Sequence, residues 1–272
     1  MNQPGQQKSP LSRLRYLGLI LVLATLLVGW LLSTPPGLLG KADAIGYAVC
    51  HRIDTRSFHL GERVFPLCVR CSGMYLGALL GMIYLNLTSP RRCGLPPAKI
   101  LVVLGMFVLA FAVDGVNSFL NLLPGFPSLY PSSNLLRLVT GTGMGLVLAV
   151  MLFLGFNQTA WKNWDGRPVI GSWRSLLGLV GLAALLVVVV NLQIPPVLYL
   201  LAVLSAGTVW AILSLVYTTL WLLMRRQDNQ ATSLKQLAFP LLVGMTLGLL
   251  QIIVFDAVRF ALTGTWQGFQ IG

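Results

Sequence analysis

Long apolar segments, separated by short polar and basic stretches, dominate the pattern along this chain. Each of seven such segments is long enough to cross a hydrocarbon core of about 30 Å as a helix, which rises about 1.5 Å per residue. The pattern therefore predicts an all-α fold, a polytopic transmembrane helix bundle. The expected spans are residues 16–32, 72–88, 100–120, 134–156, 175–193, 197–224 and 237–260.

The domain organisation follows from the same pattern. Residues 1–15 form a polar tail, and residues 16–272 form a single transmembrane domain. The first apolar segment lacks a small-residue cleavage site before Pro35-Pro36, so we expect a retained signal anchor rather than a removed signal peptide. The connection between spans 1 and 2, residues 33–71, is expected to be an extramembrane loop.

Composition supports the membrane assignment. Hydrophobic residues make up 56% of the chain and charged residues only 10%, which is too apolar for an ordinary soluble domain. The net charge of +12 would suggest nucleic acid in a soluble protein. Here the basic residues stand in short clusters between apolar segments, so we expect the lipid bilayer as partner and no nucleic acid.

Basic clusters at alternate ends of the spans predict the orientation. Twelve of the nineteen basic residues lie on one side of the predicted bundle, which the positive-inside rule makes cytoplasmic. They are Lys8, Arg13, Arg15, Arg91, Arg92, Lys99, Lys162, Arg167, Arg174, Arg225, Arg226 and Lys235. The N-terminus is then cytoplasmic, and the C-terminus and the 33–71 loop are exoplasmic. That loop also carries five basic residues, which indicates acidic partners, an anionic ligand or the opposite orientation.

Three of the four cysteines and both histidines lie in the 33–71 loop and at its junction with the second span. Cys68 and Cys71 form a C-x-x-C at a predicted helix start, where backbone N–H groups favour a thiolate. The alternating residues 57–65 predict a hairpin that turns at Gly61 with positive φ. Such a hairpin could return Cys50-His51 to the C-x-x-C.

Three chemistries compete for these residues. Cys50, Cys68 and Cys71 with His51 suit a tetrahedral metal site, most simply for zinc, with His59 as the reserve fourth ligand. Alternatively, Cys68 and Cys71 form a redox dithiol, with Arg70 and the helix start lowering a thiol pKa. A structural disulfide is the third interpretation, although it leaves one cysteine unpaired.

Ionisable residues also occur within the predicted spans. A lone charge deep in a bilayer costs about 2.5–3.5 kcal/mol on insertion scales, so Asp114, Arg137, Asp256 and Arg259 are expected to face inward and pair. They are either a structural ion-pair cluster, pairing Asp114 with Arg137 or Asp256 with Arg259, or candidate catalytic residues. Candidate substrate or anion ligands are Arg52, Arg56, Arg70, Asn117 and Asn134.

Glycines four residues apart predict close helix contacts. They occur in the second span at 73, 77 and 81, in the fourth at 141 and 145, and in the seventh at 244 and 248. If these three spans pack through the glycine faces, the C-x-x-C, Arg137 and the Asp256/Arg259 pair become neighbours.

The Cys50-His51 pair, the Arg56–Phe58 segment and the pattern C-x-R-C-x-G-x-Y-x-G over residues 68–77 resemble a family of prokaryotic polytopic membrane proteins, domain-of-unknown-function family 2085 (DUF2085). The resemblance covers about residues 45–150. It implies an integral protein of a prokaryotic plasma membrane. It implies no activity, cofactor or substrate.

The sequence is compatible with three classes of function. A membrane enzyme would use the Cys/His site with the charged residues on a lipid-linked or small anionic substrate. A thiol-disulfide oxidoreductase would use Cys68 and Cys71, and a transporter or membrane assembly factor would use the loop as a metal-stabilised lid. The chain has no Walker loop, H-E-x-x-H or G-x-S-x-G, so these motifs supply no enzyme class.

Reporter fusions test the predicted topology. A fusion within residues 38–48 should give an exoplasmic signal, because basic residues at the other end of the bundle hold that end in the cytoplasm. A fusion after residue 226 is the matched control and should report the cytoplasm. A cytoplasmic signal from the first fusion would reverse the orientation and place the cysteines in a reducing compartment.

Overall fold

The structure is a computed structural model that describes residues 10–123, 125 and 127–269. The described residues contain eight α-helices, and seven of them are long and apolar enough to cross a membrane, which confirms the predicted transmembrane bundle. The seven are α1 (Pro10–Ser33), α3 (Val69–Thr88), α4 (Ala98–Leu120), α5 (Asn134–Ala160), α6 (Trp173–Asn191), α7 (Pro195–Met224) and α8 (Leu234–Thr263).

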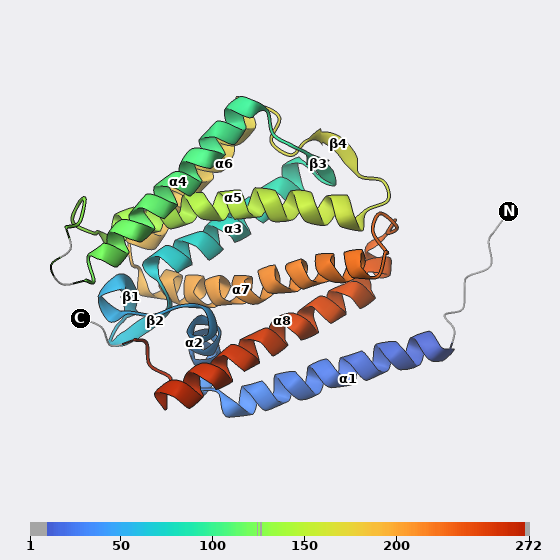
Figure 1. The fold of residues 1–272 in the computed structure, drawn as a ribbon, viewed down its shortest axis with the longest axis horizontal. Coiled ribbons are helices and arrows are strands. Elements are labelled where there is room, and N and C mark those ends of the chain that lie inside the picture. Colours follow the sequence, from blue (N-terminus) through green and yellow to red (C-terminus); the bar gives the residue numbers. More distant parts are fainter. Residues whose placement is uncertain (1–9, 124, 126, 270–272) are drawn as a thin grey trace.

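Successive long helices run back and forth between two ends of the molecule (Figure 1). One end carries the eighth helix, α2 (Gly37–Val49), and the antiparallel strands β1 (Ser57–Leu60) and β2 (Arg63–Cys68). We call it the hairpin end. The opposite end carries the start of α1 and a short parallel pair, β3 (Arg92–Gly94) with β4 (Asp165–Pro168). The predicted cytoplasmic basic residues from Arg13 onward lie on the segments at this opposite end, and Lys8 lies outside the described residues.

Part of the expected 33–71 loop is helix α2, which the sequence analysis missed. It is too short to span a bilayer, so an analysis based on span length does not detect it. Gly46 lets α2 approach β2 closely, because a Cβ there would overlap the backbone carbonyl of Pro66. The helix packs against α7 and α8, and it ends at Cys50.

The predicted hairpin is confirmed. Gly61 lies at its turn with φ of 65°, a conformation that costs glycine little. Phe58 and Phe65 pack edge to face, with ring centroids 6.2 Å apart, and join an apolar cluster with Leu76 and Leu138. This apolar cluster packs the hairpin against α3 and α5. Cys68, the last residue of β2, therefore lies at the start of α3.

The glycine faces of α3 and α5 pack directly against each other, as predicted. A Cβ on Gly73 would lie 2.6 Å from the Leu138 carbonyl oxygen, and one on Gly141 would overlap the Arg70 carbonyl. Backbones this close exclude any side chain between them. The start of α3 is therefore held against one stretch of α5.

The expectation that the seventh span joins this contact is wrong. Gly244 and Gly248 of α8 face Ser214 and Thr218 of α7 instead. A Cβ on Gly244 would overlap the Ser214 carbonyl oxygen. Small polar residues of α7, whose hydroxyls bond to their own helix, provide the matching surface.

Replacing Gly141 with alanine should destabilise the protein, because the new methyl group meets backbone rather than a movable side chain. We expect a loss of about 1–3 kcal/mol in the free energy of unfolding in detergent, the usual range for overpacking. Gly155→Ala, in the same helix, is the control, because its Cβ would meet nothing within 4 Å. Equal effects of the two substitutions would contradict the close contact.

Candidate metal centre and the charged network beside it

Three cysteines come together at the hairpin end. Cys50 follows α2, Cys68 ends β2 and caps α3, and Cys71 lies in the first turn of α3. Their Sγ atoms lie within 4.8 Å of one another. Cys50 and Cys68 are buried, and Cys71 is partly buried. The three residues could hold a metal ion.

Hydrogen bonds concentrate negative charge on Cys50. The backbone N–H of Cys68 donates to its Sγ at 3.3 Å. Hydrogen bonds from the thiols of Cys68 and Cys71 hold the pKa of Cys50 well below its usual range, and the bond to Cys50 raises the pKa of Cys68. The hydrogen bonds therefore favour the thiolate at Cys50 over the thiolates at Cys68 and Cys71, and a metal would have to displace the protons of those two thiols.

The sulfur spacing is compatible with one shared metal ion. With Zn–S bonds of about 2.3 Å, tetrahedral geometry puts sulfurs about 3.8 Å apart, which lies within the 4.8 Å that encloses the three Sγ atoms. All four cysteines are free, including Cys93, which lies at the opposite end near Asp165. Cys68 and Cys71 form no disulfide in this structure.

His51 does not join the three sulfurs in this structure. Its Nδ1 accepts a hydrogen bond from the Ile53 N–H at 3.0 Å. Burial lowers the pKa of His51, which favours the neutral ring, and an accepting Nδ1 then leaves the proton on Nε2. Its predicted role as fourth ligand stays a prediction. The reserve ligand His59 lies on the exposed side of the hairpin, 3.0 Å from Asp54.

Arg259 holds the Cys50 segment in place instead of pairing with Asp256, so that predicted pair is wrong. Its Nη1 donates to the carbonyls of Tyr47 and Cys50, both at 2.5 Å. The guanidinium lies 4.0 Å from the Tyr47 ring centroid and 4.5 Å from that of Phe269. The carbonyls at the C-terminal end of α2, which lack partners within the helix, attract this charge more directly than a carboxylate on its own helix face.

Asp256 forms no ion pair with any of the described residues, and its one side-chain partner is Trp30. One carboxylate oxygen accepts a hydrogen bond from the Trp30 indole at 3.0 Å, and the other has no partner among the described residues. The structure therefore does not gather the four candidate catalytic residues at one place.

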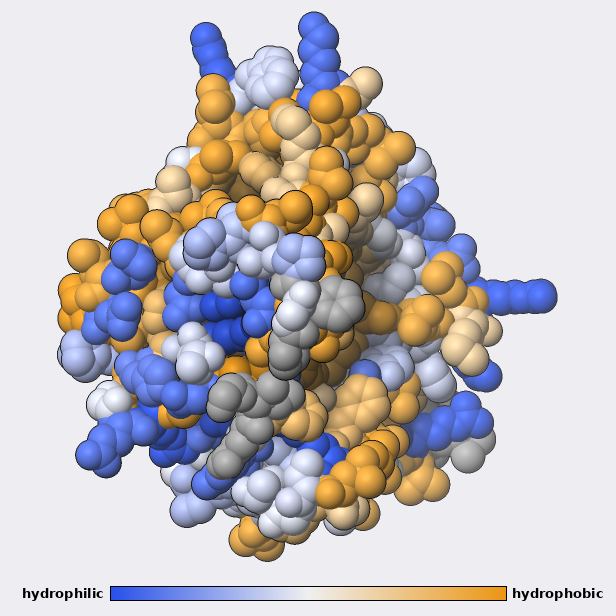
Figure 2. Space-filling model, turned by 60° about the vertical axis from the view of Figure 1, so that its left-hand side comes forward, coloured by the Kyte–Doolittle hydropathy of each residue, from blue (hydrophilic) through white to orange (hydrophobic). Residues whose placement is uncertain are grey.

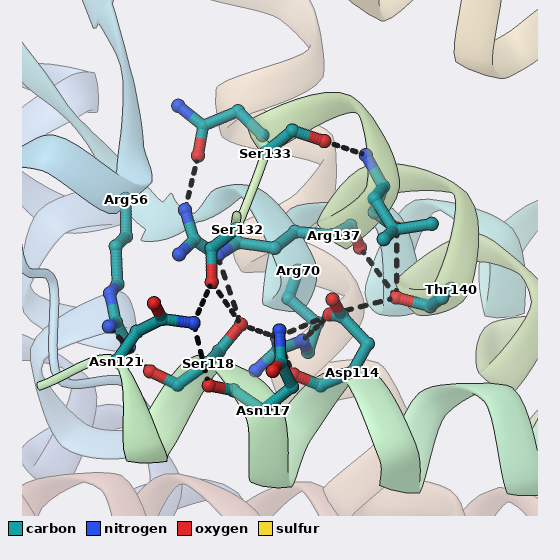
Figure 3. Close-up of polar contacts among 12 residues, drawn as sticks. Arg56, Arg70, Asp114, Asn117, Ser118, Asn121, Ser132, Ser133, Arg137 and Thr140 are labelled. Atoms are coloured by element: carbon teal, nitrogen blue, oxygen red, sulfur yellow. Dashed lines mark hydrogen bonds and ion pairs between the residues drawn. The ribbon is translucent and has the colours of Figure 1, made fainter. Parts of the chain in front are cut away.

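Asp114 pairs with Arg70 rather than with Arg137, which corrects the other predicted pair (Figure 3). Arg70 Nε donates to Asp114 Oδ2 at 3.0 Å, and its Nη2 donates to the same oxygen. Tyr130 and Thr140 hydroxyls donate to the two carboxylate oxygens at 3.2 and 3.3 Å. The reason lies in the helix contact, because the close approach of α3 to α5 turns Arg70 toward α4.

Ser118 is the common point of three arginines (Figure 3). Arg56 donates to its carbonyl at 2.6 Å, and Arg70 donates to its hydroxyl at 2.7 Å. Arg137 Nε reaches the same hydroxyl at 3.4 Å, and its Nη1 donates to Asn134 at 2.8 Å. Arg137 thus belongs to the network of Asp114 without forming an ion pair with it.

The other anion candidates have structural partners. The Asn117 side chain accepts from the Leu129 N–H at 2.7 Å and so shapes the α4–α5 loop. Arg52 donates to Asp43 at 2.9 Å, and Arg63 bonds to the same carboxylate. This group borders an open cavity of about 820 Å³.

Sequence reasoning missed four residues of these networks: Asp43, Ser118, Tyr130 and Thr140. A signal existed for Ser118, which follows Asp114 by four residues and therefore shares its helix face. Asp43 lies in α2, a helix that the sequence analysis did not predict, so its position next to Arg52 was not expected. Tyr130 is brought to Asp114 by an irregular loop, which residue spacing does not predict.

Comparisons with known proteins identify relatives over the part that carries both groups. A family model described as "Predicted membrane protein (DUF2085)" matches residues 50–151. An uncharacterized protein of Methanothermobacter thermautotrophicus is 33% identical over 103 residues, covering 38% of this chain and 83% of the relative. An uncharacterized protein of Methanocaldococcus jannaschii is 27% identical over 120 residues, covering 44% and 71%. No solved structure matches this chain.

The Arg70–Asp114 pair can be tested by a double-mutant cycle. Arg70→Gln alone leaves a carboxylate that is only 1% exposed without its cation, so the free energy of unfolding should fall by about 3–5 kcal/mol. Adding Asp114→Asn should restore part of that loss. The same cycle on Arg137 and Asp114 is the control and should show the smaller coupling. Additive losses for Arg70 and Asp114 would contradict the pairing.

Proposed function

This chain belongs to the family described as predicted membrane protein (DUF2085), and we propose that Cys50, Cys68 and Cys71 bind one metal ion, most simply zinc. The observation that carries this proposal is the meeting of three sulfurs within 4.8 Å. Cys50 follows α2, Cys68 ends β2 and Cys71 lies in the first turn of α3. Three thiolate ligands favour zinc among the common metals.

Three protein ligands leave one coordination position of a tetrahedral ion open. Structural zinc sites normally have four protein ligands, whereas catalytic sites keep a position for water or substrate. His51 follows Cys50 directly in the sequence, so its Nε2 is the first candidate for that position. The Nε2 proton would have to leave, and the imidazole ring would have to turn toward the sulfurs. A metal with an open position would act as a Lewis acid on a bound group.

The function that these features support best is that of a membrane enzyme acting on an anionic substrate, lipid-linked or small. Its site lies at the hairpin end, which the orientation proposed above makes the exoplasmic face of the plasma membrane. Arg56, Arg70 and Arg137 all contribute to the potential at His51, as does Cys50, so the cationic network and the cysteines are electrostatic neighbours. A cationic network beside a Lewis acid suits an anionic substrate.

A thiol-disulfide oxidoreductase is the second candidate, favoured by the lowered pKa of Cys50. The thiolate would attack a substrate disulfide, and Cys68 or Cys71 would then resolve the mixed disulfide. The protein would end with one disulfide, and the substrate would leave as a dithiol. This function requires the cysteines to be free of metal.

Metal analysis of purified protein, combined with a thiol count, separates the two candidates. We expect about one zinc per chain, and changing Cys50, Cys68 or Cys71 to serine should lower the metal content by more than about tenfold, because two thiolates bind the ion far less tightly than three. Cys93→Ser is the matched control and should keep the metal.

The histidine variants refine the same experiment. A loss of zinc in His51→Ala but not in His59→Ala would make His51 the fourth ligand. Unchanged zinc in both would leave that position to a water or substrate. A disulfide between Cys68 and Cys71 in protein isolated without oxidant, with no metal bound, would refute the metal centre and favour the redox function.

A further inference from the structure

We infer that Arg56, Arg70 and Arg137 form a receptor for a phosphate group at the hairpin end of the bundle. This receptor deepens the proposed function, because it names the class of substrate. Only the reaction of the bound substrate rests on the proposed function. The binding itself follows from the arginines and is independent of any metal.

The first argument is charge. The network holds three guanidinium groups, and Asp114 is its single carboxylate among the described residues. Two positive charges are therefore left over, although Arg56 is 9% and Arg137 is 6% exposed. Burial, followed by the charge of Arg70, lowers the pKa of Arg56. Such an excess calls for a bound anion, because buried charges are normally paired.

A loaded metal centre would not remove this excess. Three thiolates and one divalent ion have a net charge of −1, which offsets at most one of the two positive charges. A phosphate monoester or free phosphate carries about −1.5 to −2 near neutral pH, whereas a carboxylate carries only −1. The charge balance therefore favours phosphate.

The second argument is the set of unused donors. In the described part of the chain, Arg56 Nε and Nη1, Arg70 Nη1 and Arg137 Nη2 donate to no acceptor. None of these atoms is among those sealed from solvent without a partner. Guanidinium N–H groups that are both unused and reachable are ready to donate to oxyanion oxygens.

The third argument is geometry. The three guanidinium groups come from separate elements and converge on Ser118 (Figure 3). Arg70 is fixed by Asp114 and Arg137 is fixed by Asn134, so each presents its remaining N–H groups in a set direction. Fixed planar forks from several directions suit the oxygens of a phosphate group.

Hydrophilic residues gather on the surface at this end (Figure 2). The cavity of about 820 Å³ at this end is lined by Arg52 and Arg63 rather than by the three arginines of the receptor. Arg52 and Arg63 form a second basic group at the same end, but both already bond to Asp43. That group has one excess charge and therefore suits a phosphate less well.

The experiment uses the full-length protein in detergent, with inorganic phosphate as the probe. At about a hundred times the dissociation constant, phosphate should raise the midpoint of thermal unfolding by about 5–10 °C. Chloride at matched ionic strength should not. Calorimetric titration measures the affinity itself.

Variants of the two arginines that have no carboxylate partner test the assignment. Arg56→Gln and Arg137→Gln should each weaken phosphate binding by about 10–100-fold, the usual loss for a charge-assisted hydrogen bond. Without phosphate, both variants should unfold at or above the wild-type temperature, because a repulsive charge is gone. Arg63→Gln removes the same charge at the same end and should bind phosphate as wild type. If a glutamine variant fails to fold, Arg56→Lys and Arg137→Lys replace it and should still weaken binding.

Two further measurements complete the experiment. The first identifies the source of the phosphate group, and the second distinguishes failure of the receptor from failure of the metal centre. Binding to vesicles of phosphatidic acid, but not of phosphatidylcholine or to inorganic phosphate, would support the receptor with a lipid headgroup as its ligand. Cys50→Ser should still bind phosphate even if it loses all metal. Absence of binding to every phosphate probe, or equal losses in Arg63→Gln and Arg56→Gln, would overturn the inference.

Discussion

The close contact between α3 and α5 determines where the chemistry of this protein lies. The Arg70 carbonyl packs against Gly141, so the first turn of α3 lies in direct backbone contact with α5. From that position the Arg70 side chain reaches Asp114 on α4, and Thr140, next to Gly141, donates to the same carboxylate. A side chain at Gly141 would separate the helices and break both contacts together.

The second requirement is satisfaction of polar groups where little water is present. Asp114 receives hydrogen bonds from an arginine, a tyrosine and a threonine, so a carboxylate that is 1% exposed is fully bonded. Arg259 meets this requirement only in part: its Nη1 donates to two carbonyls at the end of α2, whereas its buried Nε has no partner among the described residues. The fully bonded Asp114 therefore fixes Arg70, between Cys68 and Cys71, more firmly than Arg259 fixes the Cys50 segment.

Much of the fold was predictable because its causes are local. Span length, the glycine turn at Gly61 and the spacing of Gly73, Gly77, Gly141 and Gly145 each depend on a few neighbouring residues. The meeting of Cys50 with the C-x-x-C was predictable too, because a hairpin returns the chain. The ion pairs were not, because a pairing depends on how helices are rotated about their axes. Arg70 and Arg137 stand at similar depth, and only the α3–α5 contact decides which of them faces Asp114.

The first turn of α3 joins the two groups of residues mechanically. Cys68 and Cys71 face the α2 and α7 side, where they pack with Val209, and Arg70 between them faces Asp114 on α4. A metal on the cysteines and an anion on the arginines would therefore bind on opposite sides of the same helical turn. Because this turn is already held against Gly141, neither ligand can move it far. Coupling between the two ligands would then act through charge, since both lie within electrostatic reach of His51, more than through a change of shape.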